Sequence, residues 1–229
     1  MPKTSYFSPE LFRFLRDLKS HNEKAWFEAN KERYQAEVRE PLLRFIGDFS
    51  ARLQKISPQY LADPRPVGGS LMRPYRDTRF STDKSPYKTM SGALFRHQTG
   101  KSVPAPAFMI HLEPGNSFAG IGLHGPDSQT LSKVRLRIAK NAEEWKAAIS
   151  GRDFKAACSF MGESLKRPPK GYRDDHPCIE DLKRKDICTT TPYTESEVCA
   201  PDFLERFAGT CAAASDFMKY LTTSLGLPW

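Results

Sequence analysis

The sequence lacks long apolar runs. Nowhere among its 229 residues do eighteen consecutive apolar side chains occur, which excludes an ordinary membrane-spanning helix. Charged residues interrupt the first twenty positions every few residues, unlike the apolar centre of a secretion signal. We therefore expect no membrane partner and a cytoplasmic location.

Cysteine is scarce, and the usual spaced metal and catalytic motifs are missing. The five cysteines are odd in number and form no Cys-x-x-Cys pair, which argues against disulfides and zinc and for reduced thiols in the cytoplasm. The five histidines show no His-Glu-x-x-His spacing, so no metal site is predicted. No Gly-x-Ser-x-Gly elbow and no Gly-x-x-x-x-Gly-Lys phosphate loop is present. Neither a cofactor nor an oligomeric state follows from the sequence.

The chain has enough apolar material for a core. Apolar residues make up 39% of it and charged residues 27%, as in ordinary globular proteins. We predict a single α+β domain over residues 1–229, in which N-terminal and C-terminal helices pack on an antiparallel sheet from the middle of the chain. Its parts are a helical region at 8–56, a strand-rich region at 65–125, and helices with a loop at 127–229.

Helix signals dominate the N-terminal region. Ser8-Pro9 is an N-cap followed by proline at the first helical position, and an apolar stripe follows at three- and four-residue spacing. Asn22 marks a second start, and Pro41 opens or kinks a third helical run. The aromatic residues along these runs are interpreted as core rather than as a cofactor site.

The middle of the chain changes to strand periodicity. Residues 105–124 predict a hairpin whose apolar side chains alternate toward one face, which leaves Gly120, Gly122 and His111 on the other. Two glycines on one face allow a ligand or a helix to approach the backbone closely. Further along, the expected elements are a helix at 127–149 with Arg137 pointing away from the core, a short helix near 178–185, a strand at 186–191 and a last helix at 202–224.

Positive charge gathers in the middle. The formal net charge is +8; residues 58–170 hold eighteen Lys/Arg against nine Asp/Glu, whereas residues 171–229 hold six against ten. This excess favours an anionic partner such as a phosphate, a nucleotide, a nucleic acid or a carboxylated metabolite, although a solvated basic surface has the same composition.

The stretch RPYRDTRFSTDKSPYK (73–88) contains five Lys/Arg, two Asp and four hydroxyl residues. Pro74 disfavours a central strand, so we expect an edge segment that runs into a loop. Arginine presents a planar fork of donors that suits phosphate or carboxylate. The predicted ligand-binding residues, expected to converge on one concave site, are Arg76, Arg79, Lys84, Lys88 and Arg135.

Four residues are the candidates for proton transfer or nucleophilic attack: Asp77, Asp83, Tyr87 and His176. With a phosphate held by the cations, Asp or His acting as general base would give phosphoryl transfer or phosphoester hydrolysis. The function predicted is therefore binding of a small phosphorylated or carboxylated ligand in a basic pocket, with or without catalysis.

Three alternatives remain open. The Arg/Asp cluster can be a structural network that fixes its own loop. Single-stranded nucleic acid can follow the basic residues and stack on Tyr75, Phe80 and Tyr87, but the acidic last quarter interrupts this field. A non-catalytic interaction module would instead present a large exposed apolar patch.

The motif RDTRFSTDKSPYKT resembles the hallmark of an uncharacterised family, domain of unknown function 2461. Further segments resemble it in the same order: WFEANKERY, LSKVRLRI, LKRPPKGY, DLKRKD and FMKYLTTSLGLP. The resemblance implies an α+β fold and brings no established activity. The resemblance marks all the charged residues of 76–88 together with Phe80, Pro86 and Tyr87. It also marks Arg135 and, in the later loop, Gly171, Asp175, His176 and Pro177. The chain departs from the pattern at Pro74, His124 and Arg173-Asp174.

Overall fold

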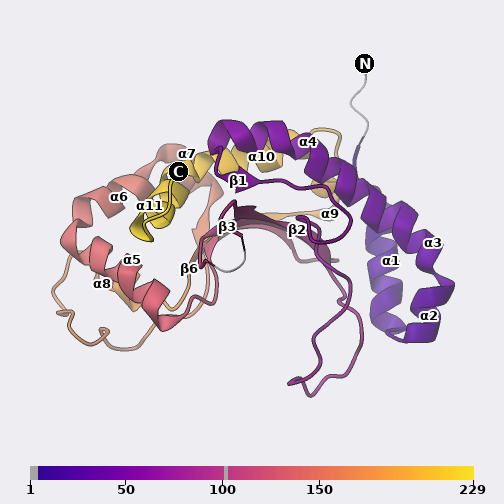
Figure 1. Cartoon of the computed structure of the whole chain (residues 1–229), viewed down its shortest axis with the longest axis horizontal. Helices are drawn as coiled ribbons and strands as arrows, with labels where there is room; N and C mark the ends of the chain where they lie inside the picture. The colour runs from indigo at the N-terminus through magenta and orange to yellow at the C-terminus, as the bar shows by residue number, and fades with distance from the viewer. Residues whose placement is uncertain (1–4, 101–102) are drawn as a thin grey trace.

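The computed structural model describes residues 5–100 and 103–229 (Figure 1). The N-terminal region forms the helices α1 (Pro9–Ser20), α2 (Lys24–Ala29), α3 (Lys31–Tyr34), the π-helical turn η1 (Gln35–Arg39) and α4 (Glu40–Ile56). Pro9 and Pro41 lie in the first turns of α1 and α4, as the sequence predicts. Within the described residues, every helix is too short or too polar to cross a bilayer.

Six antiparallel strands form one sheet in the order β1-β2-β3-β4-β6-β5. The strands are β1 (Tyr60–Leu61), β2 (Ser91–His97), β3 (Ala107–Leu112), β4 (Ser117–Leu123), β5 (Ser159–Phe160) and β6 (Ile187–Tyr193). The predicted hairpin is confirmed, with Met109 opposite Gly120 and Ala107 opposite Gly122. The fold class is thus α+β, with helices from both ends of the chain on a mainly central sheet.

The remaining helices are α5 (Ser128–Lys140), α6 (Ala142–Ser150), α7 (Arg152–Ala157), α8 (Ile179–Lys183), α9 (Glu195–Val198), α10 (Phe203–Ala213) and α11 (Ser215–Ser224). The prediction of one helix at 127–149 was wrong, because the helical backbone breaks at Asn141. The predicted last helix is likewise divided, at Ala214. In both places the apolar periodicity continues across the break, so sequence spacing alone does not reveal it.

Arg137 also differs from the prediction. It does not point away from the packed face: its guanidinium lies 4.5 Å from the ring centre of Tyr220 and donates to Thr223 Oγ1 at 2.6 Å. It also forms an ion pair with Glu144. Arg137 therefore joins α5 to α6 and α11, both of which pack against α5.

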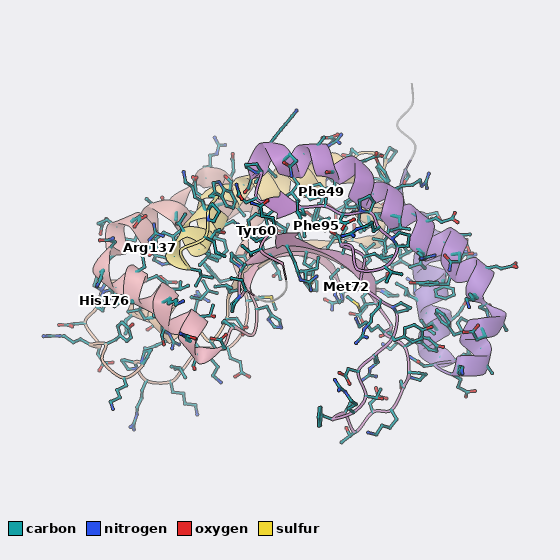
Figure 2. All side chains as sticks on the ribbon, in the orientation of Figure 1. Phe49, Tyr60, Met72, Phe95, Arg137 and His176 are labelled. Carbon is teal, nitrogen blue, oxygen red and sulfur yellow. The ribbon has the colours of Figure 1, made fainter. Side chains whose placement is uncertain are left out.

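One face of the sheet carries the core. Helices α4, α10 and α11 pack on it. Phe49 of α4 contacts Phe95 of β2, with 4.7 Å between their ring centres. Figure 2 shows Phe49, Tyr60 and Phe95 on this side and Met72 on the opposite, concave side. Two arms flank the concave side: α1, α2, α3 and the 73–88 segment on one, and α5 and α8 on the other (Figure 1).

Candidate functional site

The 73–88 stretch is a protruding loop. At its base, the two ends of the loop run antiparallel and are joined by backbone hydrogen bonds. The Arg76 N–H donates to Pro86 O at 2.9 Å and the Lys88 N–H to Pro74 O at 2.8 Å. Just before it, the Met72 N–H donates to Gly92 O in β2 at 2.9 Å, so the chain runs along the sheet before it leaves. The prediction of an edge segment that continues into a loop is confirmed.

Charged groups of this loop pair with one another. Arg76 pairs with Asp83, and the Arg79 guanidinium donates to Asp77 at 2.7 Å. The Lys84 ammonium donates to the Thr78 carbonyl at 2.9 Å. These contacts are the internal Arg/Asp network that the sequence left open as an alternative.

The two carboxylates of the loop are poorly suited to take up protons. Hydrogen bonds from Ser85 and Arg76 hold the pKa of Asp83 well below its ordinary value, and hydrogen bonds from Arg79 lower the pKa of Asp77. A carboxylate with a depressed pKa is a weak base near neutral pH, which argues against Asp77 and Asp83 as general bases.

The other two catalytic candidates occupy structural positions. The ring of Tyr87 is buried and stacks on Phe27, with 4.1 Å between ring centres. The His176 ring bridges two elements: its Nδ1 accepts from the Cys178 N–H at 3.1 Å, and its Nε2 lies 3.2 Å from the Ala139 carbonyl of α5. Both ring nitrogens are thus engaged, and His176 ties the 167–177 loop to α5.

The five predicted cations do not converge on one site. Arg135 lies farthest from the other four, which belong to the 73–88 loop. It lies on α5, across the concave side from the 73–88 loop (Figure 1), and donates to the Arg184 carbonyl at 2.8 Å. Its Nε is buried and has no hydrogen-bond partner in the described parts of the chain, and burial lowers its pKa. Helix α5 directly follows the β3–β4 hairpin in the chain, but it does not lie near the 73–88 loop. Strands β2, β3 and β4 separate the two.

A different set of cations does surround one hollow. A cavity of about 620 Å³ lies between α3, η1, the 66–75 segment and β2, within the range of small-molecule sites. We call it the basic pocket. Its positive residues are Lys31, Arg39, Arg73, Lys88 and Arg96, and Phe27, Tyr34 and Tyr75 add aromatic wall. No Asp, Glu or His occurs among the described residues that line it.

Three of the pocket cations lack partners. Across residues 5–100 and 103–229, no hydrogen bond or ion pair engages the side chain of Arg73, Lys88 or Arg96, whereas Arg39 donates to Gln35 Oε1 at 2.7 Å and Lys31 pairs with Glu28. Burial, with a contribution from nearby Arg73, lowers the pKa of Lys88, and burial lowers that of Arg96. These shifts mean that desolvation of the charged forms is not offset within the chain.

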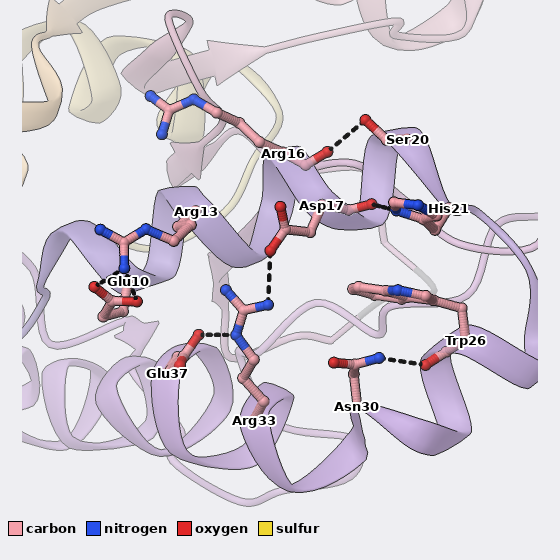
Figure 3. Close-up of polar contacts among 10 residues, drawn as sticks. All are labelled: Glu10, Arg13, Arg16, Asp17, Ser20, His21, Trp26, Asn30, Arg33 and Glu37. Atoms are coloured by element: carbon pink, nitrogen blue, oxygen red, sulfur yellow. Dashed lines mark hydrogen bonds and ion pairs between the residues drawn. The ribbon is translucent and has the colours of Figure 1, made fainter.

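Contacts within the helical arm orient one wall of the pocket. Arg33 donates to Asp17 at 2.7 Å and to Glu37 at 3.0 Å, which fixes α3 and η1 against α1 (Figure 3). The opposite helical side then presents Lys31, Gln35 and Arg39 to the hollow at four-residue spacing. Gln35 and Arg39 bound the π-helical turn, a local geometry frequent at functional sites.

The 66–75 segment forms the second wall, and it depends on Gly69. A Cβ on Gly69 would lie 2.5 Å from Asp63 O and 2.6 Å from Arg65 O, so no other residue fits this turn without backbone movement. The Ser70 N–H donates to Asp63 O at 2.8 Å and closes the turn. Arg73 lies three residues after Ser70 and lines the pocket.

A second, apolar hollow adjoins the basic pocket. This cavity, of about 580 Å³, lies on the concave face of the sheet, and we call it the sheet-face cavity. Leu94, Met109, Phe118 and Gly120 are among its lining residues. Met72, Leu94 and Arg96 line both hollows, so the two are contiguous.

Three possible metal ligands meet at the far end of the sheet-face cavity. One donor atom each from His124, Asp186 and Cys188 lies within 4.8 Å of the others, and His124 Nδ1 is 3.3 Å from Asp186 Oδ1. A nitrogen, an oxygen and a sulfur ligand would suit Zn²⁺ with an open coordination position. Sequence spacing could not find this set, because His124 follows β4, whereas Asp186 directly precedes β6 and Cys188 lies in it, more than sixty residues later.

Sequence reasoning also missed four of the five pocket cations: Lys31, Arg39, Arg73 and Arg96. Lys31 and Arg39 share one helical side with Tyr34 and Gln35, a mixed aromatic and basic stripe that was a usable signal. Arg96 alternates with buried Phe95 in β2, which places it on the open face. Arg73 carries no such signal, because its direction depends on the turn at Gly69.

One comparison with known proteins gives a match. A family model described as "Conserved hypothetical protein (DUF2461)" matches residues 10–220. No curated protein and no solved structure matches the chain.

Proposed function

Since the chain belongs to the DUF2461 family of conserved hypothetical proteins, whose description states no activity, we propose its function from geometry: it binds a small phosphorylated or carboxylated ligand in the basic pocket. One observation carries the proposal. Arg73, Lys88 and Arg96 line a hollow without any carboxylate among its described lining residues, and none of the three side chains forms a hydrogen bond or ion pair within residues 5–100 and 103–229.

An anion would supply what these side chains lack. Arginine donates two parallel hydrogen bonds to phosphate or carboxylate, and lysine adds a compact charge. Ion pairs in a desolvated site are stronger than at an open surface, so the lowered pKa values of Lys88 and Arg96 mark positions where an anion gains most. The aromatic wall formed by Phe27, Tyr34 and Tyr75 would contact the rest of the ligand.

The proposal is binding rather than catalysis. The four catalytic candidates of the sequence, Asp77, Asp83, Tyr87 and His176, do not line the basic pocket, and its described lining residues include no carboxylate or histidine. Phosphoryl transfer or phosphoester hydrolysis would need a general base within hydrogen-bond reach of the reacting group. A sensor or carrier needs only the cations.

Calorimetry with defined anions tests the proposal. The probes are inorganic phosphate, glucose 6-phosphate, AMP and citrate, titrated into the wild type and into Arg73→Ala, Lys88→Ala and Arg96→Ala. Because a hydrogen bond to a charged group contributes about 1.5–3 kcal/mol, each variant should weaken binding roughly 10- to 100-fold. The matched control is Arg79→Ala, which removes one charge from an exposed arginine paired with Asp77 outside the pocket.

The outcomes separate clearly. Binding that disappears in the pocket variants and persists in Arg79→Ala supports the proposal, provided that the thermal midpoints show folded proteins. No binding to the wild type by any probe, or equal binding by all variants, overturns it.

Single-stranded nucleic acid is the second candidate, because Phe80 is 96% exposed at the loop tip, with the Arg79 guanidinium 5.8 Å from its ring centre. This arrangement suits base stacking. Titration of a fluorescent oligonucleotide at low salt tests it. Binding that is lost in Phe80→Ser and weakens steeply with added salt would favour it over the small ligand.

A further inference from the structure

The concave face of the sheet is open, although its residues are largely apolar. In β2, Ala93 and Phe95 are buried toward the helices, whereas Leu94 and Arg96 alternate to the concave side. Met109 and Phe118 continue the same side on β3 and β4. These apolar side chains line the sheet-face cavity rather than a helix interface.

Gly120 forms the floor of this cavity. A Cβ on Gly120 would lie 3.1 Å from Met109 Cε and 3.5 Å from Phe118 Cε2, so the ends of these two side chains cover the glycine and a larger residue there would push them into the cavity. Methionines surround this floor: Met72, Met109 and Met161 all line the cavity. Unbranched methionine side chains adapt to apolar groups of irregular shape.

The apolar cavity and the basic pocket are contiguous at their shared residues Met72, Leu94 and Arg96. The positively charged pocket therefore lies directly beside an apolar cavity. A purely polar anion would leave the sheet-face cavity unused, and a purely apolar molecule would leave Arg73 and Lys88 without partners. A molecule with an anionic head and an apolar body complements both.

We propose that the ligand is a soluble amphipathic anion, an alkyl or aryl phosphate or carboxylate, whose head binds in the basic pocket and whose body lies in the sheet-face cavity against Met109 and Phe118. This inference rests on the proposed function and adds the chemical class of the ligand. The two cavities, of about 620 and 580 Å³, each lie within the size range of small-molecule sites.

A chain-length series of monomeric probes tests the class. Inorganic phosphate, butyl phosphate and hexyl phosphate, all below their aggregation concentrations, are titrated by calorimetry into the wild type. Burial of one methylene strengthens binding about fourfold, so hexyl phosphate should bind at least about fivefold more tightly than butyl phosphate even when the chain is only partly buried.

Two variants of the sheet-face cavity test whether the apolar part of the ligand binds there. Gly120→Val fills the floor, and Met109→Asn makes it polar; Met109→Asn serves alone if Gly120→Val does not fold. Each should reduce the gain between butyl and hexyl phosphate to less than about twofold and leave the affinity for inorganic phosphate unchanged. Arg73→Ala should instead weaken all three probes equally.

The outcomes distinguish the two proposals. Equal binding of the three phosphates overturns the amphipathic ligand and leaves the proposed function standing, and so does a chain-length gain that survives both cavity variants. Absence of binding by every probe overturns both proposals. Binding to phosphatidic acid vesicles without binding to hexyl phosphate overturns the soluble ligand in favour of a lipid surface.

Discussion

The side chain of Asn22 pairs with the backbone of Tyr87 as a neighbouring strand would. Asn22 Nδ2 donates to Tyr87 O at 3.0 Å, and the Tyr87 N–H donates to Asn22 Oδ1 at 3.0 Å. This pair ties the corner between α1 and α2 to the base of the 73–88 loop. Since Lys88 is the next residue, the same two hydrogen bonds fix one cation of the basic pocket.

Asn22→Ala should destabilise the fold. The substitution leaves the part-buried N–H and carbonyl of Tyr87 without their partner, which costs about 1–3 kcal/mol. Guanidinium unfolding should show a lower midpoint with an unchanged slope. Gln129→Ala, at an exposed position of α5, is the control and should unfold like the wild type. A variant as stable as the wild type would show that the pair contributes no net stability.

The ring of Tyr87, and not its hydroxyl, should contribute to the stability of the fold. Its ring stacks on Phe27, so Tyr87→Ala should destabilise by about 3–5 kcal/mol, in line with other buried aromatic truncations. No hydrogen bond to the Tyr87 hydroxyl occurs within the described parts of the chain, and Tyr87→Phe should therefore remain within about 1 kcal/mol of the wild type. Thermal unfolding of both variants checks this. A large loss in Tyr87→Phe would instead indicate a role for the hydroxyl.

Local signals in the sequence predicted the elements well. Ser8-Pro9 and Pro41 mark helix starts because a cap or a proline acts within one turn of chain. The hairpin was predicted because apolar side chains alternate along residues 105–124, and the same alternation placed Gly120 and Gly122 on the opposite face. The breaks at Asn141 and Ala214 were missed because tertiary packing, not local propensity, decides where such helices end.

The candidate site agrees with the sequence expectation in its basic character but differs from it in position. A basic region with unpaired cations was expected, and Lys88 does line the basic pocket. The other loop charges were misplaced, because Asp77 and Arg79 are close enough along the chain to pair across a turn. Arg39 and Arg96 meet Lys88 only through the tertiary fold, a relation that spacing along the chain does not encode.

Thiol chemistry should be slow in the native protein. Burial raises the pKa of all five cysteine thiols, that of Cys188 to about 12. The thiolate is the reactive form, and at pH 8 a thiol with that pKa is ionised in only on the order of one molecule in ten thousand. Ellman's reagent should react slowly with native protein and release five equivalents in denaturant. Rapid modification of one native thiol would contradict this expectation.

Anion affinity should decrease at high pH because of Lys88. Burial lowers its pKa in the free protein, so the ammonium loses its proton at a lower pH than an exposed lysine does. A bound anion favours the charged form and raises this pKa, and binding in the interval between the two values takes up a proton. Affinity for inorganic phosphate should therefore fall as the pH rises through that interval, which begins below the ordinary lysine value.

Lys88→Arg is the decisive variant for this pH dependence, because an arginine remains charged throughout the range. Its affinity should stay nearly constant where that of the wild type falls. Lys84→Arg, a matched change outside the basic pocket at a residue that donates to Thr78 O, should decline as the wild type does. Calorimetric titrations between about pH 7 and 10 measure all three proteins. If Lys88→Arg loses affinity in parallel with the wild type, another group governs the decline and Lys88 does not contact the anion.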